Sequence, residues 1–318
     1  MIASLFSQTC VVALAGGVGG SKMVNGLAQI LPPENLFIIA NTGDDFEHLG
    51  LYICPDLDTI MYTLAGINNL QTGWGRADET WQVMSNLRDL DGPAWFNMGD
   101  KDLATSLLRT HWLRQGRTLS EVTGELCRRF GARPTLRPMT DSPVRTIVHT
   151  DEGELGFQDY FVQRRCEPRL QKLVFAGADT VTVSDEIAAA IRTADLIVMA
   201  PSNPWLSLDP ILALPGMTGL IQNSTAPKIG VSPIIGGTTV KGPAAKIMRE
   251  LGVEVSPLGV AQHLQSTLTG LVIDTVDQEH QARIEDLGLK AWCADTLMRS
   301  PQDQARLARI VIEFGLKQ

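Results

Sequence analysis

Short apolar runs and amphipathic stretches alternate along the first forty residues of the chain. Val11–Ala15 is an apolar run that predicts a buried strand, and the residues after it repeat apolar side chains at helical spacing as far as Ile30. Leu36–Ala40 predicts a second buried strand. A strand, a helix and a strand within about 30 residues form a βαβ unit, in which the two strands are parallel.

The middle of the chain, residues 59–175, has a different pattern and contains four of the six tryptophans. Apolar residues at helical spacing predict four helices there, and three extended segments follow them. The predicted helices are residues 57–64, 80–90, 103–115 and 119–130, and the extended segments are residues 135–139, 145–150 and 155–162.

The alternation of buried strands and helices resumes after this segment. Residues 196–200, 228–231, 271–274 and 291–293 predict strands, and helices are expected up to Gln222, over residues 244–251 and over residues 302–314. The pattern therefore predicts an α/β protein with a Rossmann-like parallel sheet. Residues 1–58 and 176–318 would form this core, and residues 59–175 a large, mainly helical insertion that caps the sheet.

Four of the predicted strands are followed by small or polar residues. The segments are GGVGGSK, NTGDD, APSNP and VSPIIGG. In an open α/β sheet, ligands bind beyond the carboxyl ends of the strands, so these segments should converge on one site.

The charge of the chain limits how this site can bind phosphates. Lys and Arg total 27 against 35 Asp and Glu, a net charge of −8, with no basic stripe of the kind that binds nucleic acid. Phosphates would have to bind locally, through backbone N–H groups, a few Lys or Arg side chains, or a metal ion. The longest apolar stretches are too short for a membrane span, and the five cysteines form no C-x-x-C pair. We therefore expect a cytoplasmic protein without nucleic-acid or membrane partners.

The glycine turn after the first strand is the first candidate ligand site. Gly16, Gly17, Gly19 and Gly20 would let the backbone approach a diphosphate at the start of a helix, and Lys22 follows. The spacing matches neither G-x-G-x-x-G nor a Walker A motif, so a tight turn without a ligand is the alternative.

Acidic residues after the second strand point to a divalent cation. Asp44 and Asp45 are adjacent, and Asp56 and Asp58 follow closely. Mg²⁺ prefers one or two carboxylates together with phosphate oxygens of a substrate. The alternative is a solvated turn at Asp44 and Asp45, with Asp58 or Thr59 capping a helix.

The segments after two later strands offer hydrogen-bonding groups. Ser202, Asn203 and Ser232 suit a base, a ribose or a phosphate, and Lys241 is either a phosphate partner or a solvated lysine. The chain has no G-x-S-x-G motif and no cysteine near a histidine. Direct displacement at phosphorus therefore suits these residues better than covalent catalysis.

Eight motifs, in this order, resemble those of the 2-phospho-L-lactate transferase family of coenzyme F420 biosynthesis. They cover nearly the whole chain and read AGGVGGSKMVNGL, NTGDDFEHLGLYICPDLDT, MGDKDLATSLLRT, PMTDSPVRT, GFQDYFVQRR, APSNPWLSLDPIL, VSPIIGG and VKGPAAKIM. The resemblance implies a homodimeric enzyme that moves a phospho-acid from its GDP-activated form to a hydroxyl of the deazaflavin Fo. GMP leaves in this reaction, and Mg²⁺ is required.

The resemblance also implies roles for individual residues. Asp58 and Asp45 would be catalytic, and Asp58, Thr59 and Asn97 would bind Fo, although the family carries a basic residue where Asn97 stands. The metal would lie at Asp44, Asp45 and Asp58. The nucleotide and its phosphates would lie at Gly16, Gly17, Gly19, Gly20, Lys22, Asn41, Ser202, Asn203 and Ser232.

Two arginines are the candidates for binding the transferred acid. Arg164 and Arg165 suit a carboxylate or a phosphate, and Cys166 stands where archaeal members of the family carry glycine. A buried thiol that only fills space is the alternative for Cys166. The acid itself is left open among phospholactate, phosphoenolpyruvate and 3-phosphoglycerate.

Two other functions remain as alternatives. The gluconeogenesis-factor family shares the core and binds nucleotide-sugars as a regulator, but the NTGDD and PDLDT segments fit the transferase better. An NAD-dependent dehydrogenase is disfavoured because the chain lacks G-x-G-x-x-G.

Overall fold

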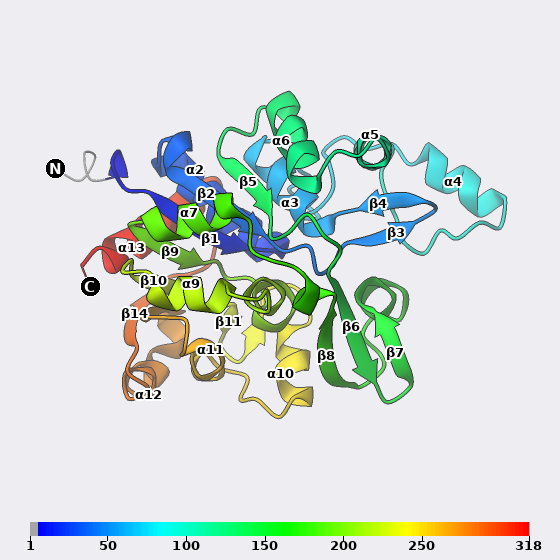
Figure 1. The fold of residues 1–318 in the computed structure, drawn as a ribbon. Helices are drawn as coiled ribbons and strands as arrows, with labels where there is room; N and C mark the ends of the chain where they lie inside the picture. Colours follow the sequence, from blue (N-terminus) through cyan, green and yellow to red (C-terminus); the bar gives the residue numbers. More distant parts are fainter. Residues whose placement is uncertain (1–5, 318) are drawn as a thin grey trace.

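A parallel sheet of seven strands forms the centre of the protein (Figure 1). The structure, a computed structural model, describes residues 6–317. Every neighbouring pair in the sheet is parallel. In spatial order the strands are β14 (Lys290–Ala294), β13 (Gly270–Asp274), β10 (Lys228–Val231), β9 (Leu196–Met199), β1 (Val11–Ala15), β2 (Leu36–Ala40) and β5 (Thr135–Pro138).

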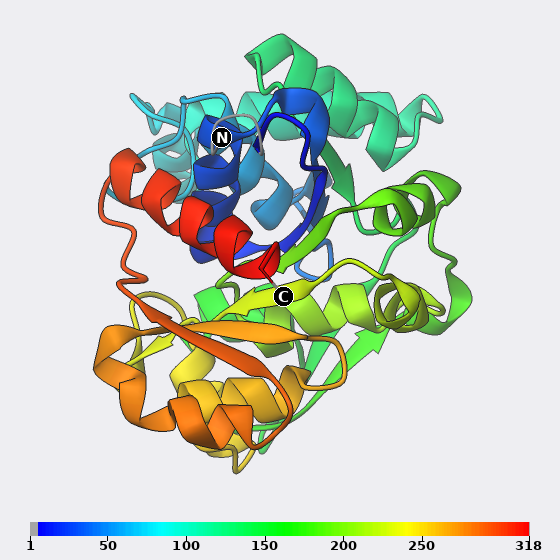
Figure 2. The same ribbon diagram turned by 90° about the vertical axis from the view of Figure 1, so that its left-hand side faces the viewer.

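Helices cover both faces of this sheet because its strands are apolar on both sides. Along β1, Val11, Ala13 and Ala15 pack into one hydrophobic cluster, and Val12 and Leu14 pack into the other. The first cluster includes α2 (Gly17–Ile30), α3 (Pro55–Leu64), α6 (Leu119–Phe130) and α13 (Pro301–Gly315), which Figure 2 shows above the sheet. The second includes α7 (Asp185–Thr193), α9 (Met217–Asn223), α10 (Ala244–Glu250), α11 (Pro257–Leu264) and α12 (Gln281–Glu285).

The chain reverses its direction of travel through the sheet between β1 and β9. From β1 it passes to β2 and β5, and it then returns to the other side of β1 and continues outward through β9, β10, β13 and β14. This strand order is that of a doubly wound Rossmann-like fold, in which ligands bind at the carboxyl ends of the strands where the order reverses. The predicted fold class is therefore confirmed.

Smaller elements extend from one end of this core, on the right of Figure 1. They include a hairpin, a three-stranded antiparallel sheet in the order β7-β6-β8, and the projecting helix α4. No helix within residues 6–317 is both long enough and apolar enough to cross a bilayer. The bounds are β3 (Phe46–His48), β4 (Leu51–Ile53), α4 (Gln82–Asp89), α5 (Asp100–Arg114), β6 (Arg145–Thr150), β7 (Gly153–Gly156), β8 (Leu170–Ala176), β11 (Ile234–Ile235) and β12 (Thr238–Thr239).

Three segments differ from the sequence prediction. Residues 135–139 were expected in the insertion, but β5 pairs with β2 in the main sheet. Residues 155–162 were expected to be extended, but β7 ends at Gly156 and a π-helix over Asp159–Gln163 follows. The helix expected up to Gln222 is divided into a π-helix (Pro204–Leu208), α8 (Asp209–Leu212) and α9. Pro215 and the positive φ of Gly216 (86°) separate the last two, because neither residue suits a continuous helix.

The helices α2 and α13 pack so closely that one glycine is required between them. A Cβ atom added at Gly26 would lie 2.2 Å from the backbone oxygen of Gln304. Gly26→Ala should therefore push the helices apart and destabilise the fold by roughly 1–3 kcal/mol. Thermal unfolding should show a Tm several degrees lower.

Gly219 in α9 is the matched control, because a Cβ atom added there meets nothing within 4 Å. Gly219→Ala should leave the Tm unchanged or raise it, since alanine favours a helix by up to about 1 kcal/mol over glycine. Equal Tm values for the two variants would contradict the close packing of α2 on α13.

Candidate active site

A cavity of about 790 Å³ opens where the sheet order reverses. Core segments that follow β1, β9 and β10 line it, and so do parts of the insertion, including Trp95 and Phe161. Four polar segments predicted to converge do meet at this edge: Gly16, Asp44, Ser202 and Ser232 all line the cavity.

The glycine turn is locked to the segment after β9. The Gly16 N–H donates to Ser202 Oγ (3.0 Å), and Ser202 Oγ donates to the Gly16 carbonyl oxygen (2.8 Å). A Cβ atom added at Gly19 would lie 2.3 Å from the Pro201 oxygen, and one at Gly20 would lie 2.5 Å from Ser202 Oγ. Packing against this segment therefore requires glycine at these positions, and Gly20 does not itself line the cavity.

Asp56 and Asn41 support the same turn through hydrogen bonds. Asp56 accepts hydrogen bonds from the Gly17 N–H (2.8 Å) and from Asn41 Nδ2 (2.9 Å). Asn41 also donates to the Leu206 oxygen and accepts from the Gly43 N–H. Asn41 is fully buried behind the cavity lining, so the structure assigns it a supporting position.

The supporting role of Asp56 could have been found from its spacing to Asp58. The two residues lie two positions apart near the start of α3. Side chains with this spacing in a helix point about 200° apart, so they cannot serve one group in the same way. Asp56 accordingly points to the glycine turn, whereas Asp58 pairs with Arg109. Neither Asp58 nor Thr59 caps α3, because its N-cap is Cys54.

Polar side chains in the segments after β9 and β10 mostly form hydrogen bonds within the protein. Asn203 Oδ1 accepts from the backbone N–H groups of Trp205 and Leu206, whereas its Nδ2 is buried without a hydrogen-bond partner. Ser232 Oγ exchanges hydrogen bonds with the backbone of Ile234. The Asn203 amide is thus an unsatisfied donor in a residue that lines the cavity.

Two of the three predicted metal-binding aspartates line the cavity. Asp44 and Asp58 do so, and Asp44 Oδ1 is buried without a partner. Burial raises the pKa of Asp44 well above its usual range, and the nearby Asp56 carboxylate raises it further. A bound cation would offset both effects. Residues 6–317 contain no group of three His, Cys, Asp or Glu side chains placed to hold a metal alone, so Mg²⁺ would need substrate oxygens as well.

A buried arginine accompanies Asp58. Arg109 of α5 forms an ion pair with Asp58 and is only 1% exposed. Burial opposes the charge of Arg109, but the Asp58 carboxylate outweighs it and raises the Arg109 pKa. Burial raises the pKa of Asp58, and Arg109 limits that rise. Arg109 lies in the segment MGDKDLATSLLRT, but no role was predicted for it, because its pairing with Asp58 depends on how α5 is placed against α3.

Asp45 lies behind the cavity wall. It is 1% exposed, its carboxylate oxygens have no N–H or O–H donor as a partner, and the Cys54 thiol lies beside them. It does not line the cavity, unlike its neighbour Asp44. Burial raises the Asp45 pKa to about 8, although Arg145 opposes the shift.

The predicted Fo-binding residues lie beside an aromatic wall. Thr59 and Asn97 line the cavity next to Trp95 and Phe96. Asn97 Oδ1 accepts a hydrogen bond from Arg88 on α4. The sequence analysis missed a polar pair at this wall, in which Tyr62 Oη donates to Asp102 Oδ1 (2.8 Å). Burial and the Asp58 charge raise the pKa of Asp102 to about 7.

The residues predicted to bind the acid do not reach the cavity. Arg164 pairs with Glu152 on the small antiparallel sheet, Cys166 is buried, and none of residues 164–166 lines the cavity. The preceding π-helix presents Phe161 and Val162 to the cavity instead. The cations that line it are Lys22, Lys241 and Arg299, and no motif pointed to Arg299.

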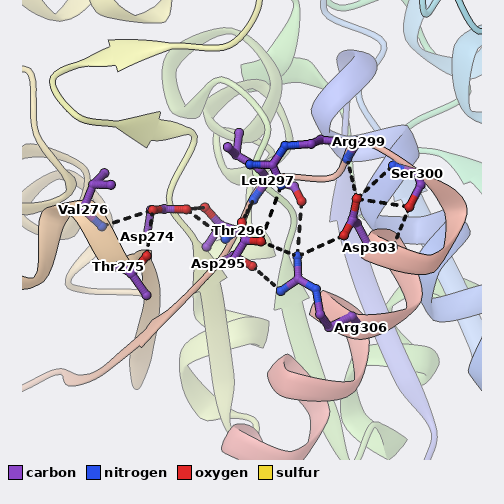
Figure 3. A network of polar contacts seen from close by, with 10 residues as sticks. All are labelled: Asp274, Thr275, Val276, Asp295, Thr296, Leu297, Arg299, Ser300, Asp303 and Arg306. Atoms are coloured by element: carbon purple, nitrogen blue, oxygen red, sulfur yellow. Dashed lines mark hydrogen bonds and ion pairs between the residues drawn. The ribbon is translucent and has the colours of Figure 1, made fainter.

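A strap between β14 and α13 lines the cavity, and Figure 3 shows the polar contacts around it. Residues 296–299 form this strap, and Lys22 Nζ donates to its Met298 oxygen (2.9 Å). Asp274 accepts hydrogen bonds from the Thr296 N–H and Oγ1 at one end. Arg306 binds the oxygens of Asp295 and Leu297 at the other end. The strap is therefore fixed to both β13 and α13.

Comparison with known proteins identifies the family. A family model described as 2-phospho-L-lactate transferase CofD matches residues 11–309. The chain belongs to the 2-phospho-L-lactate transferase family. It is accordingly an enzyme of coenzyme F420 biosynthesis that transfers a phospho-acid to Fo, which confirms the function indicated by the motifs.

Relatives of the 2-phospho-L-lactate transferase family match over nearly their whole length. The phosphoenolpyruvate transferase of Streptomyces griseus subsp. griseus is 41% identical and covers 96% of this chain and 98% of its own. The 2-phospho-L-lactate transferase of Methanosarcina mazei is 36% identical and covers 95% and 99%. A solved structure of a UPF0052 family member from Bacillus halodurans has a TM-score of 0.63 at 14% identity, covering 96% of this chain and 99% of that one. The last similarity concerns the fold alone.

The buried Asp45 should make the stability of this transferase depend on pH. Its carboxyl has an ordinary pKa of 3.8 when unfolded and about 8 when folded. Between these values the folded chain keeps a proton that the unfolded chain has lost, so its contribution to stability is present at low pH and falls as the pH rises. Asp45→Asn removes this loss and should raise the Tm above wild type by roughly 2 °C or more at pH 8.

The same variant should differ less from wild type at pH 5, where folded Asp45 is already neutral. Thermal unfolding from pH 5 to pH 8 measures this difference. A variant that is less stable than wild type at pH 8 would show that Asp45 is held there as a charged carboxylate.

Proposed function

We propose that this enzyme transfers the phosphoenolpyruvyl group from its GDP-activated form to the primary hydroxyl of Fo. The observation that supports the reaction is one cavity that combines a glycine turn, the carboxylates of Asp44 and Asp58, and an aromatic wall. The choice of acid rests on the relatives. Those named phosphoenolpyruvate transferases have 37–41% identity, whereas those named 2-phospho-L-lactate transferases have 35–36%.

The donor would lie along the glycine turn. The Gly17 N–H is bound by Asp56, so the N–H groups that follow it in the first turn of α2 would face the diphosphate together with Lys22. The start of a helix carries unpaired donors and positive potential. Ser202, Asn203 and Ser232 would lie on the guanosine side, where the Asn203 amide offers its free donor.

The acceptor would lie against the wall built by the insertion. Trp95, Phe96 and Phe157 supply apolar surface for the flat deazaflavin ring. The ribityl chain would reach toward Asp58, Thr59 and Asn97. Because these residues and the glycine turn share one cavity, the hydroxyl of Fo and the donor phosphorus can meet there.

The reaction would be an in-line displacement. The Fo hydroxyl oxygen bonds to the phosphorus that carries the acid, the bond from that phosphorus to the oxygen of GMP breaks, and the hydroxyl proton is released. The Asp58 carboxylate, held in place by its ion pair with Arg109, would accept a hydrogen bond from the Fo hydroxyl and so orient it. Mg²⁺, held by Asp44 and Asp58 together with donor oxygens, would supply positive charge for the diphosphate and the departing GMP.

The remaining assignments follow from the same geometry. Asn41 and Asp56 would act indirectly, by holding the glycine turn. Asp45 would support its loop from behind the cavity wall. Arg164, Arg165 and Cys166 would influence the acid only through Phe161 and Val162. We also propose that the enzyme works as a homodimer, which sedimentation of the purified protein would measure.

The decisive experiment supplies each acid in turn. The enzyme, a partner guanylyltransferase, GTP, Mg²⁺ and Fo are incubated with phosphoenolpyruvate, 2-phospholactate or 3-phosphoglycerate, and the Fo products are weighed by mass spectrometry. We expect the phosphoenolpyruvyl product to form fastest. A faster 2-phospholactate or 3-phosphoglycerate product would overturn the proposed acid, and no Fo product with any acid would overturn the transfer itself.

Asp58 should be required for transfer. Asp58→Asn removes the charge that orients the hydroxyl and holds the cation, so the transfer rate should fall by roughly 100-fold or more. Asp44→Asn should instead raise the Mg²⁺ concentration needed for half-maximal rate, because one of two carboxylates remains. Asp286→Asn, at an exposed position on the far side of β14, is the matched control. A fully active Asp58→Asn enzyme would remove Asp58 from the mechanism.

A further inference from the structure

Within residues 6–317, two lysines on the cavity wall have only backbone carbonyl groups as hydrogen-bond partners. Lys22 Nζ donates to the Met298 oxygen (2.9 Å), and Lys241 Nζ donates to the Thr72 oxygen (2.8 Å). Both residues line the same cavity. Neither takes part in any ion pair formed within residues 6–317. Arg299, the third cation at the cavity, differs because it pairs with Asp295.

The loop that receives Lys241 is packed tightly over the glycine turn. Gly73 has a positive φ of 79°, and a Cβ atom added there would lie 2.8 Å from Val18 Cγ1 and 3.2 Å from Lys241 Nζ. Thr72, Val18 and Lys241 all line the cavity. The ammonium group of Lys241 is therefore held in place beside the glycine turn, where the segment after β12 meets the insertion.

Holding two positive charges at one cavity is unfavourable unless an anion joins them. Burial lowers the pKa of Lys22, and the Lys241 charge lowers it further, so the ammonium group of Lys241 is near enough to oppose the charge of Lys22. An anion between them would turn this repulsion into attraction and replace carbonyl partners with charge-assisted hydrogen bonds, which are stronger.

We propose that Lys22 and Lys241 form a two-lysine subsite for a diphosphate, in which Lys241 exchanges the Thr72 carbonyl oxygen for a phosphate oxygen of the ligand. The identity of that ligand as the diphosphate of the GDP-activated donor rests on the proposed function. The subsite itself requires only an anion with two neighbouring charges. The sequence left Lys241 open between a phosphate partner and a solvated side chain. The proposed subsite gives it a binding role.

Calorimetric titration with inorganic pyrophosphate and with GDP, each with Mg²⁺, tests the subsite without any transfer reaction. Lys241→Met should weaken both ligands by roughly 10-fold or more, because one charge-assisted hydrogen bond is lost. Lys241→Arg should restore most of the affinity. The wild-type affinity should also fall more steeply with added salt than that of Lys241→Met. Lys172→Met, at an exposed position on β8, is the matched control and should bind as wild type does.

Two results would overturn the subsite. One is a wild-type protein that does not bind pyrophosphate. The other is a Lys241→Met variant that binds pyrophosphate as wild type does, whatever its Tm, which would make Lys241 only a tie between the loop and the core. In either case the transfer of an acid to Fo could still be observed, so the subsite can fail while the proposed function stands. If pyrophosphate binds but no acid is transferred to Fo, the subsite stands and the proposed function fails.

Discussion

The paired hydrogen bonds between the Gly16 peptide and the Ser202 hydroxyl connect the two halves of the sheet at the place where the strand order reverses. They join segments 186 residues apart in sequence. Because Ser202 both accepts and donates, it fixes the glycine turn and the segment after β9 relative to one another. Asp56 and Asn41 then support the turn from α3 and β2. The position of the cavity, and of every group around it, depends on this junction.

Charges of opposite sign reach the cavity from different elements. The acids come from the segment after β2 and from α3 and α5, and they are Asp44, Asp56, Asp58 and Asp102. The cations come from α2, from the segment before α10 and from the strap before α13, and they are Lys22, Lys241 and Arg299. Such a separation suits a reaction in which a neutral hydroxyl meets an anionic donor. It also explains how a chain with a net charge of −8 can bind a diphosphate, since the acids near the site can be matched by a cation and by Arg109.

The sequence predicted the features that depend on local patterns. Val11–Ala15 and Leu36–Ala40 were found at their observed bounds because buried parallel strands are continuous apolar runs. Gly16, Asp44 and Ser202 were placed at one edge because strand ends converge there. Features that depend on pairing between distant segments could not be predicted from the sequence. The membership of β5 in the main sheet, the position of Arg109 against Asp58 and the distance of Arg164 from the cavity all belong to this class.

The return of the chain to the main sheet at β5 divides the insertion into two lobes. One lobe leaves after β2 and ends at β5, and the other leaves after β5 and ends at β9. Each lobe therefore begins and ends on strands of one rigid sheet, with its own part of the cavity wall: Trp95 and Phe96 in the first, Phe157 and Phe161 in the second. The supports of the glycine turn, Asn41 and Asp56, belong to the first lobe. The second lobe can therefore be exchanged with that of a relative by joining the chain at β5 and β9, while the glycine turn and its supports remain in place.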